Sequence, residues 1–310
     1  KDRGRMDMDF NNLFIMQGML FSLMLLGLYL RKIGMITDSN RELLTDLVVN
    51  VTLPCSIVKS FEMEFNGEIL RSCLVIFLVA IGIQIGSFLL SYMLYPGVEE
   101  KHKKVLQYAT ICSNAGILGN PIAEGIFGPL GLMYASVYLI PQRTFMWSMG
   151  LTYFTECPDK KSLVKKVATH PCIIAVAIGL FLMIAQLRLP GFVGQTVHTL
   201  AGANTGISML FIGSILAGQC FKSMWTRLTV YYAFVRLFLV PFLVWAVCAL
   251  LHLNPLVTGV SVVLAGMPAA SVTAILAAKY SCDEVFATKC VISSTLLSMV
   301  TAPLWCIFLA

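Results

Sequence analysis

The chain has 310 residues, of which 58% are hydrophobic and only 12% are charged, and its mean hydropathy is +0.82. A soluble domain carries about twice that share of charged residues, so the composition excludes a soluble globular protein and indicates a membrane protein. The ten cysteines show no C-x-x-C spacing and no cluster with histidine. We interpret them as small apolar residues and expect no metal site.

Apolar runs long enough to cross a bilayer follow one another along almost the whole chain. They predict an all-α integral membrane protein with ten transmembrane helices, at 11–31, 40–60, 69–95, 103–127, 130–154, 170–187, 196–219, 228–251, 255–280 and 284–308. Because the first run has the length of a full span, we interpret it as a helix and not as a signal peptide. We expect the natural chain to begin at Met6 or Met8.

Lysine and arginine predict the orientation of these spans, because cytoplasmic loops are enriched in both. One set of loops and helix ends carries fourteen of them, namely Arg31, Lys32, Arg41, Lys101, Lys103, Lys104, Lys160, Lys161, Lys165, Lys166, Lys222, Arg227, Lys279 and Lys289. The other side carries Lys59, Arg71 and Arg188, apart from the first five residues. We therefore expect both termini to be extracytoplasmic. The net charge of +6 is this topology signal and predicts no nucleic-acid partner.

The spans divide into two halves, residues 11–154 and 170–310, which share the same order of plain and interrupted spans. In each half the fourth span is interrupted by glycine and proline. Because each half has an odd number of spans, the second copy is inverted relative to the first. The candidate site residues at the first interruption are Asn114, Ala115, Gly116, Gly119, Asn120 and Pro121, and those at the second are Gly266, Met267, Pro268, Ala269, Ala270 and Ser271.

Interrupted helices at corresponding positions of inverted halves indicate the binding site of a transporter near the bilayer midplane. Proline removes a backbone donor and glycine permits unwinding, and the freed backbone groups must find partners within the protein or water. Each half-helix that follows a break directs its N–H groups and positive dipole end at the site, which favours an anionic substrate. The alternative is that each proline merely kinks a packed helix.

At these residues the sequence resembles the auxin efflux carrier family of membrane transport proteins, which includes the plant PIN carriers. The resemblance covers essentially the whole chain. It rests on Asn114-x-Gly116-x-x-Gly119-x-Pro121, on Ala278-Lys279-Tyr280-Ser281-Cys282-Asp283, on Ser294-Thr295-Leu296-Leu297-Ser298, on Leu53-Pro54 and on Arg236-x-x-x-x-Pro241.

The resemblance implies a ten-span inverted-repeat fold that is also found in bile-acid sodium symporters. It implies that spans 1, 2, 6 and 7 form a scaffold that often dimerises, and that spans 3–5 and 8–10 form a moving transport domain in which the broken helices cross. It further implies elevator-type transport of small organic anions such as carboxylates. The sequence departs from the family pattern at Asn120, where an apolar residue is usual, and at His170-Pro171, where Asn-Pro is commoner.

Three charged residues are candidates for ion coupling or charge pairing. Glu124 lies three residues after Pro121. Placing a charge inside a membrane costs free energy, so a charged residue there indicates a structural or functional role. Arg143 lies deep in the fifth span, where it could neutralise Glu124 or face an anion. Asp46 lies near the cytoplasmic end of the second span, where a solvated surface position is the alternative. For Arg236 we expect the side chain to reach towards the membrane interface.

The sequence thus predicts a multi-pass transporter of the plasma membrane that works as a homodimer and is driven by an ion gradient or the membrane potential. No ATP-binding motif of the form G-x-x-x-x-G-K-[ST] occurs, so we expect no cofactor beyond Na⁺ or H⁺ as a coupling ion. The alternatives are a channel, suggested by Asn120-Pro121-Ile122 and Met267-Pro268-Ala269, and an intramembrane enzyme, for which no catalytic motif is present.

Overall fold

The computed structural model describes residues 10–63, 66–147, 150, 153, 165, 168–217, 224–279 and 282–309, and the described chain is helical almost throughout. The first half contains α1 (Phe10–Lys32), α2 (Asp38–Leu47), the π-helical turn η1 (Val48–Thr52), α3 (Leu53–Ser60), α4 (Gly67–Met93), α5 (Glu100–Ile111), the π-helical turn η2 (Ala115–Gly119) and α6 (Asn120–Trp147). The second half contains α8 (Pro171–Ala185), α9 (Gly191–Leu216), α11 (Arg227–Phe234), the π-helical turn η4 (Val235–Leu239), α12 (Val240–Leu250), α13 (Pro255–Ala265), α14 (Val272–Lys279) and α15 (Glu284–Leu309).

The bounds of these helices agree with the expected spans to within a few residues. The main differences are at the seventh span, where α9 begins at Gly191, and at the fifth, where most of 148–154 lies outside the described residues. Five helices of the described chain are long and apolar enough to cross a membrane, namely Ser39–Ser60, Gly67–Met93, Ala115–Met146, Arg227–Leu250 and Glu284–Leu309. The chain is therefore an all-helical, multi-pass membrane protein.

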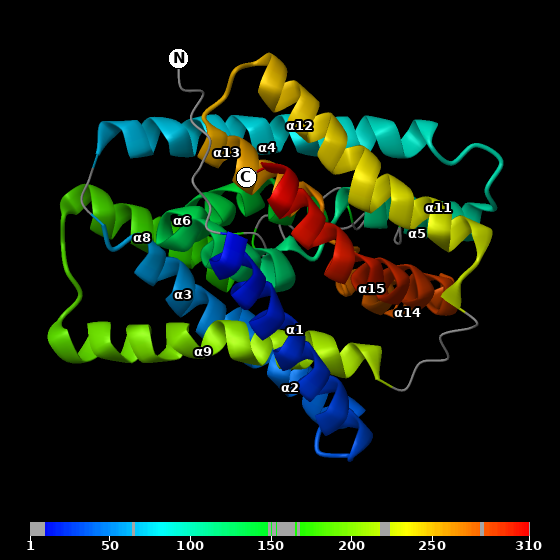
Figure 1. Ribbon diagram of the computed structural model, residues 1–310, viewed down its shortest axis with the longest axis horizontal. Coiled ribbons are helices and arrows are strands. Elements are labelled where there is room, and N and C mark those ends of the chain that lie inside the picture. The colour runs from blue at the N-terminus through cyan, green and yellow to red at the C-terminus, as the bar shows by residue number, and fades with distance from the viewer. Residues whose placement is uncertain are drawn as a thin grey trace.

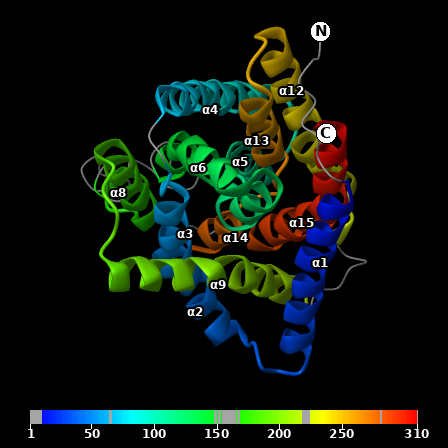
Figure 2. The ribbon, with the colours of Figure 1, turned by 60° about the vertical axis from the view of Figure 1, so that its left-hand side comes forward.

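The helices pack in two groups (Figures 1 and 2). In the group that we call the scaffold group, α9 contacts α1, α2 and α3, and α8 contacts α3. In the group that we call the crossing group, α4 packs on α5 and α6, α13 packs on α6 and α12, and α15 packs on α11 and α14. The two groups meet where α6 contacts α3, α8 and α9, and where α1 reaches α15.

Glycine allows the closest approach inside the scaffold group. A β carbon at Gly27 of α1 would collide with the backbone of Leu210 in α9, and one at Gly213 of α9 would collide with the backbone of Met24 in α1. Small residues at a helix crossing let two backbones approach closely, which is how helices associate in membranes. The packing of α1 against α9 therefore requires glycine at both positions.

Three prolines share a local structure that lets the helix continue through them. The π-helical turns η1, η2 and η4 each end two residues before a proline, at Pro54, Pro121 and Pro241. A proline ring clashes with the carbonyl group four residues earlier and offers no N–H to it. In a π turn the N–H bonds to the carbonyl group five residues earlier instead of four, which widens the backbone at this point. The proline-containing motifs of the sequence thus correspond to π turns inside continuous helices.

The two halves use similar caps where the helices α8 and α13 begin. Pro171 and Pro255 each occupy the first turn, where the missing N–H is not needed. The carboxamide oxygen of Asn254 accepts a hydrogen bond from Leu256 N at 2.8 Å, and His170 Nδ1 accepts one from Cys172 N at 3.2 Å. His170 thus performs the capping that asparagine performs in α13, which explains how histidine can precede proline here.

Candidate functional site

The first interruption of a helix lies between α5 and η2. α5 ends at Ile111, Cys112 has extended backbone angles (φ −103°, ψ 112°), and helical structure begins again at Ala115. The expected break from Asn114 to Pro121 is therefore wrong at its C-terminal end, because Pro121 lies second in α6. The unwound residues are Cys112 to Asn114. We call 115–127 the first half-helix; it ends at Gly128, whose left-handed angle (φ 68°) separates it from the rest of α6.

The second interruption coincides with the segment expected from the sequence. α13 ends at Ala265 and α14, the second half-helix, begins at Val272. Between them, Gly266 closes α13 by donating from its N–H to the carbonyl oxygen of Val262 at 2.9 Å, and the N–H of Thr273 bonds to the carbonyl oxygen of Ala270 at 2.9 Å. The chain is non-helical from Met267 to Ala270.

The two interruptions cross and bind each other through their backbones. The N–H of Asn114 donates to the carbonyl oxygen of Pro268 at 2.8 Å, and the N–H of Ala270 donates to the carbonyl oxygen of Cys112 at 3.2 Å. Ser113 and Ala269 form an isolated antiparallel bridge between them. Residues that are about 155 positions apart in the sequence are thus brought together.

Side chains of the crossing group satisfy several of the backbone groups that unwinding frees. Gln142 Nε2 donates to the carbonyl oxygen of Ser113 at 2.7 Å, and Ser113 Oγ donates back to Gln142 Oε1 at 3.1 Å. Gln84 Nε2 reaches the carbonyl oxygen of Ile111 at 3.3 Å, and the N–H of Ala269 donates to Ser294 Oγ at 3.2 Å. Such partners are what an irregular backbone needs at membrane depth.

Arg236 is the residue that the sequence interpretation missed. Its side chain is only 3% exposed, so the expectation that it reaches the membrane interface is wrong. Nε donates to the carbonyl oxygen of Met267 in the second interruption, and Nη1 donates to that of Thr110 at the end of α5, both at 2.9 Å. One guanidinium therefore ties the second interruption to the end of the helix that leads into the first. The motif Arg236-x-x-x-x-Pro241 indicated that position 236 matters, but it did not predict these hydrogen bonds.

Gly119 determines how closely the first half-helix approaches the second interruption. A β carbon there would lie 2.7 Å from Leu264 Cδ2 and 3.0 Å from Met267 Cγ. Both neighbours are buried, so little space is available for a side chain. Close packing therefore explains why glycine occupies position 119.

Several buried polar groups at the crossing have no hydrogen-bond partner among the described residues. They are Asn114 Nδ2, both polar atoms of the Asn120 carboxamide, Arg143 Nη1 and Ser271 Oγ. Asn114 is the N-cap of the first half-helix, yet its side chain makes no capping hydrogen bond. Buried polar groups are normally paired, so a cluster of unpaired ones indicates a place for water, an ion or a polar ligand.

The structure separates the charged candidates from one another. Glu124 is half-buried and faces Lys59 and Ser56 of α3, and no ion pair within 4.0 Å joins it to Arg143 among the described residues. Arg143 lies instead beside Gly116, where Nη2 is 3.4 Å from the position of an added β carbon. Asp46 is exposed near the end of α2, which fits a solvated position. The Glu124–Arg143 pair is thus not formed.

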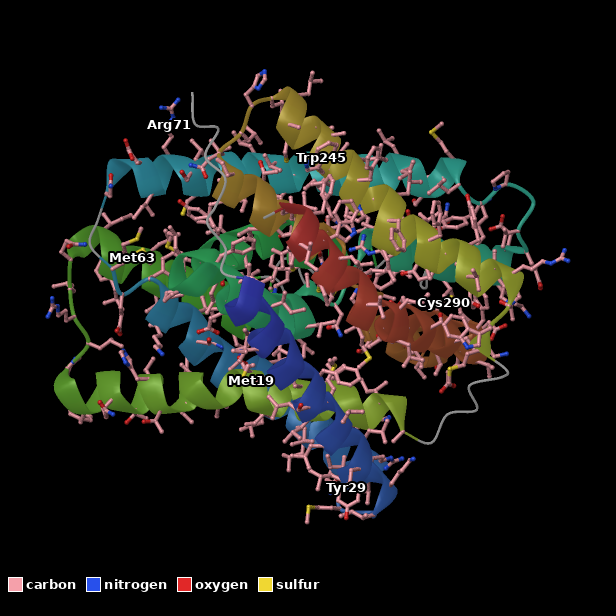
Figure 3. The ribbon with its side chains drawn as sticks, in the orientation of Figure 1. Met19, Tyr29, Met63, Arg71, Trp245 and Cys290 are labelled. Atoms are coloured by element: carbon pink, nitrogen blue, oxygen red, sulfur yellow. The ribbon has the colours of Figure 1, made fainter. Side chains whose placement is uncertain are left out.

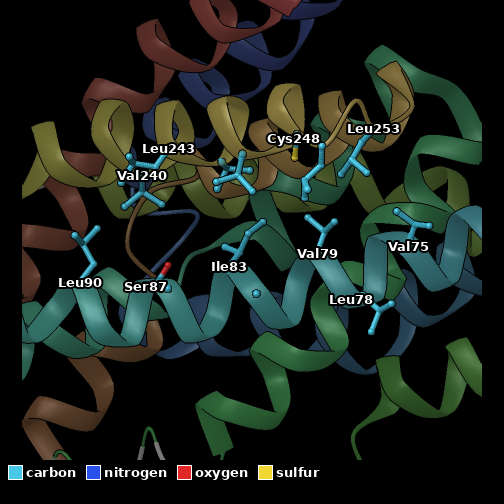
Figure 4. A pocket seen from close by; sticks show the side chains of 15 residues that line it. Val75, Leu78, Val79, Ile83, Ser87, Leu90, Val240, Leu243, Cys248 and Leu253 are labelled. Atoms are coloured by element: carbon cyan, nitrogen blue, oxygen red, sulfur yellow. The ribbon is translucent and has the colours of Figure 1, made fainter.

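Two cavities help to locate the site. One of about 350 Å³ lies between the groups, where Leu118 and Ile122 of the first half-helix face Met24 of α1, Met209 of α9 and Ser298 of α15. The other, a groove of about 480 Å³ between α4 and α12, is lined by apolar side chains such as Ile83 and Leu243, with Ser87 as its polar exception (Figure 4). The groove carries no charged group and does not suit an anion.

Comparisons with known proteins identify the family of the chain. The sequence profile of the family described as "Membrane transport protein" matches residues 18–306. An uncharacterized transporter of Methanothermobacter thermautotrophicus is 26% identical, with 93% of this chain and 95% of the relative covered. Uncharacterized transporters of Methanocaldococcus jannaschii and of Escherichia coli K12, the latter named YfdV, are each 24% identical over 91% of this chain and cover 94% and 93% of their own lengths. These matches confirm the family resemblance.

Proposed function

Because the chain belongs to the membrane transport protein family, we propose that it is a secondary transporter of small organic anions that bind where the interrupted helices cross. The observation that carries the proposal is the pairing of Asn114 with Pro268 next to unpaired polar side chains. Two half-helices begin there, and the first N–H groups of a helix have no partner within it. Such helix starts attract negative charge.

The packing supports an elevator mechanism for this transporter. The scaffold group is held together by the glycine contacts of α1 and α9, and the crossing group by the backbone bonds and Arg236. A cavity already lies between the groups at the first half-helix. We propose that the crossing group slides against the scaffold group and carries the substrate with it. A homodimer through the scaffold group, in the plasma membrane with both termini extracytoplasmic, completes the proposal.

A channel is a weaker explanation of the same crossing. In a channel the polar groups at the crossing would border a continuous aqueous path, whereas Asn114, Asn120 and Arg143 are each at most 6% exposed. A site that is closed to solvent needs a conformational change to release its ligand, which is typical of a transporter. The two functions differ in an observable way, since flux through a transporter saturates with substrate.

Uptake into proteoliposomes tests the proposal. A panel of radiolabelled carboxylates is offered under imposed Na⁺, pH and voltage gradients, and we expect saturable uptake of at least one of them. Asn114→Ala should abolish the saturable part while the protein remains folded. The matched control is Asn66→Ala, because Asn66 also occupies an N-cap position but is exposed at the start of α4. Normal transport in Asn114→Ala would remove the crossing as the binding site.

A further inference from the structure

The groove of about 480 Å³ between α4 and α12 lies outside the helix crossing and faces the membrane (Figure 4). Exposed apolar side chains line it, because Leu78 of α4 is 58% exposed, and Val247 and Leu251 of α12 are 54% and 60% exposed. Lipid tails are as apolar as such side chains. Water would find few partners here, since Ser87 is the polar exception among the described lining residues. The groove therefore suits an apolar occupant.

Glycine deepens this groove without serving helix packing. A β carbon at Gly82 or at Gly86 would meet no atom within 4 Å, whereas Gly27 and Gly213 lie against the backbone of a neighbouring helix. Both Gly82 and Gly86 line the groove. Close packing within the chain does not explain these two glycines, so the space above them is open to a molecule from outside the chain.

Contacts beside the groove hold its two walls in place. α13 packs on both α4 and α12 (Figure 2). Beyond the end of the groove near Leu90, Tyr231 Oη of α11 donates to the carbonyl oxygen of Leu94 at 3.1 Å, and the ring of Tyr231 meets that of Tyr95 edge-on. Since α11 continues through η4 into α12, these contacts join the same two walls. The groove is thus preformed in the structure.

Two basic side chains lie at the opposite end, where Figure 4 shows Val75 and Leu253. Arg71 precedes Val75 by four residues and therefore lies on the same face of α4. It is exposed and points away from the neighbouring helices (Figure 3). His252, next to Leu253, is exposed as well. Glu68 lies one turn before Arg71, but no ion pair within 4.0 Å joins them among the described residues.

The length of α4 places Arg71 at the level of the lipid headgroups. From Arg71 to Met93 the helix runs for about 33 Å, which is close to the thickness of the hydrocarbon core. Along α4 the groove extends from Val75 to Leu90, about 22 Å. It is longer than half of the core, about 15 Å, so an acyl chain can lie in it along its whole length.

We propose that this groove binds one anionic phospholipid, with an acyl chain between α4 and α12 and the phosphate at Arg71 and His252. The apolar lining fits the chain, and a guanidinium offers paired N–H donors to phosphate oxygens. An imidazole adds an N–H donor in either protonation state. Both walls belong to the crossing group, so the bound lipid stabilises that group by mass action. The lipid site is separate from the proposed substrate site.

Native mass spectrometry of the purified full-length protein tests the site, with phosphatidylglycerol and phosphatidylcholine of identical acyl chains as probes. The wild type should retain one phosphatidylglycerol and bind it at least about fivefold more tightly than phosphatidylcholine, the effect of one basic residue near an anionic headgroup. In Arg71→Gln this preference should disappear. In Gly82→Leu, whose new side chain enters the groove, the binding of both lipids should be lost.

Matched variants separate the site from general effects of charge and size. Arg188→Gln removes another exposed arginine, and Gly202→Leu adds the same side chain at an exposed glycine of α9 with no atom within 4 Å of its β carbon. Both should bind phosphatidylglycerol as the wild type does. Melting temperatures in lipid-free detergent report whether the variants fold, and there Arg71→Gln should match the wild type. Added phosphatidylglycerol should raise the melting temperature of the wild type more than that of Arg71→Gln.

If Gly82→Leu does not fold, phosphatidylglycerol with a photoreactive acyl chain takes its place. In the wild type it should crosslink to peptides of α4 or α12, and crosslinks confined to other helices would overturn the proposal. The same holds for equal affinities of the wild type for the two lipids, for an unchanged preference in Arg71→Gln, and for wild-type binding by a folded Gly82→Leu.

A dimer that Gly82→Leu converts into a monomer would assign the groove to a second copy of the chain and would also overturn the lipid site. None of these measurements involves transport. A failure of the lipid site therefore leaves the proposed function intact, and a failure of carboxylate uptake leaves the lipid site intact.

Discussion

The N–H of Asn114 donates to the carbonyl oxygen of Pro268 at 2.8 Å, which makes the two helix interruptions one structural unit. The bond joins a segment of the first half of the chain to its counterpart in the second half. Each interruption thereby supplies backbone partners that the other needs in the membrane interior. A change in one should therefore affect the other.

Arg236 should be required for the stability of the crossing. Its two hydrogen bonds, to the carbonyl oxygens of Met267 and Thr110, are buried and charge-assisted. Arg236→Met keeps an apolar side chain but leaves both carbonyl groups unpaired, at a cost of about 3 kcal/mol. We expect the melting temperature in detergent to fall by several degrees. Arg71→Met, at an exposed position, should leave it unchanged, and a stable Arg236→Met protein would contradict the role.

Gly119 should not tolerate even one additional carbon. Because a β carbon would lie 2.7 Å from Leu264 Cδ2, Gly119→Ala forces the half-helix away from the second interruption, and overpacking of this kind costs about 1–3 kcal/mol. Gly82→Ala in α4, where no atom lies within 4 Å of the added carbon, is the matched control. Thermal unfolding of the two variants measures the difference, and equal stability would show that Leu264 and Met267 can move aside.

Much of the fold was predictable because membrane helices follow local rules. A run of apolar residues depends on composition alone. The positions of α4, α12 and α15 followed from such runs, and the interruption from Gly266 to Ser271 followed from its glycine and proline. The inverted repeat and the division into moving and fixed groups remain predictions.

What could not be predicted depends on partners that are distant in the sequence. Arg236 looks like an interfacial residue within its own helix, but its carbonyl partners lie 31 and 126 residues away. Pro121 looks like a helix breaker, but the π turn before it absorbs the clash. Glu124 and Arg143 look like a pair, yet Glu124 faces Lys59 in another helix. For Arg236 and Glu124 the tertiary contact overrides the local signal.

Glu124 is the candidate for ion coupling, because it sits on the first half-helix and faces Lys59 and Ser56 of the scaffold group. A carboxylate that crosses between two environments during an elevator movement can carry H⁺ or bind Na⁺ on one side only. We expect uptake by the wild type to depend on one of these gradients, and uptake by Glu124→Gln to proceed at a rate that does not change with either gradient.

The measurement is initial uptake into proteoliposomes with the pH gradient and the Na⁺ gradient imposed separately. Glu68→Gln is the matched control, because Glu68 lies exposed in the first turn of α4 and should keep the dependence of the wild type. If uptake by Glu124→Gln keeps both the pH dependence and the Na⁺ dependence of the wild type, Glu124 belongs to the contact with α3 alone. A Na⁺ dependence that disappears while the pH dependence persists would identify Na⁺ as the ion that Glu124 binds.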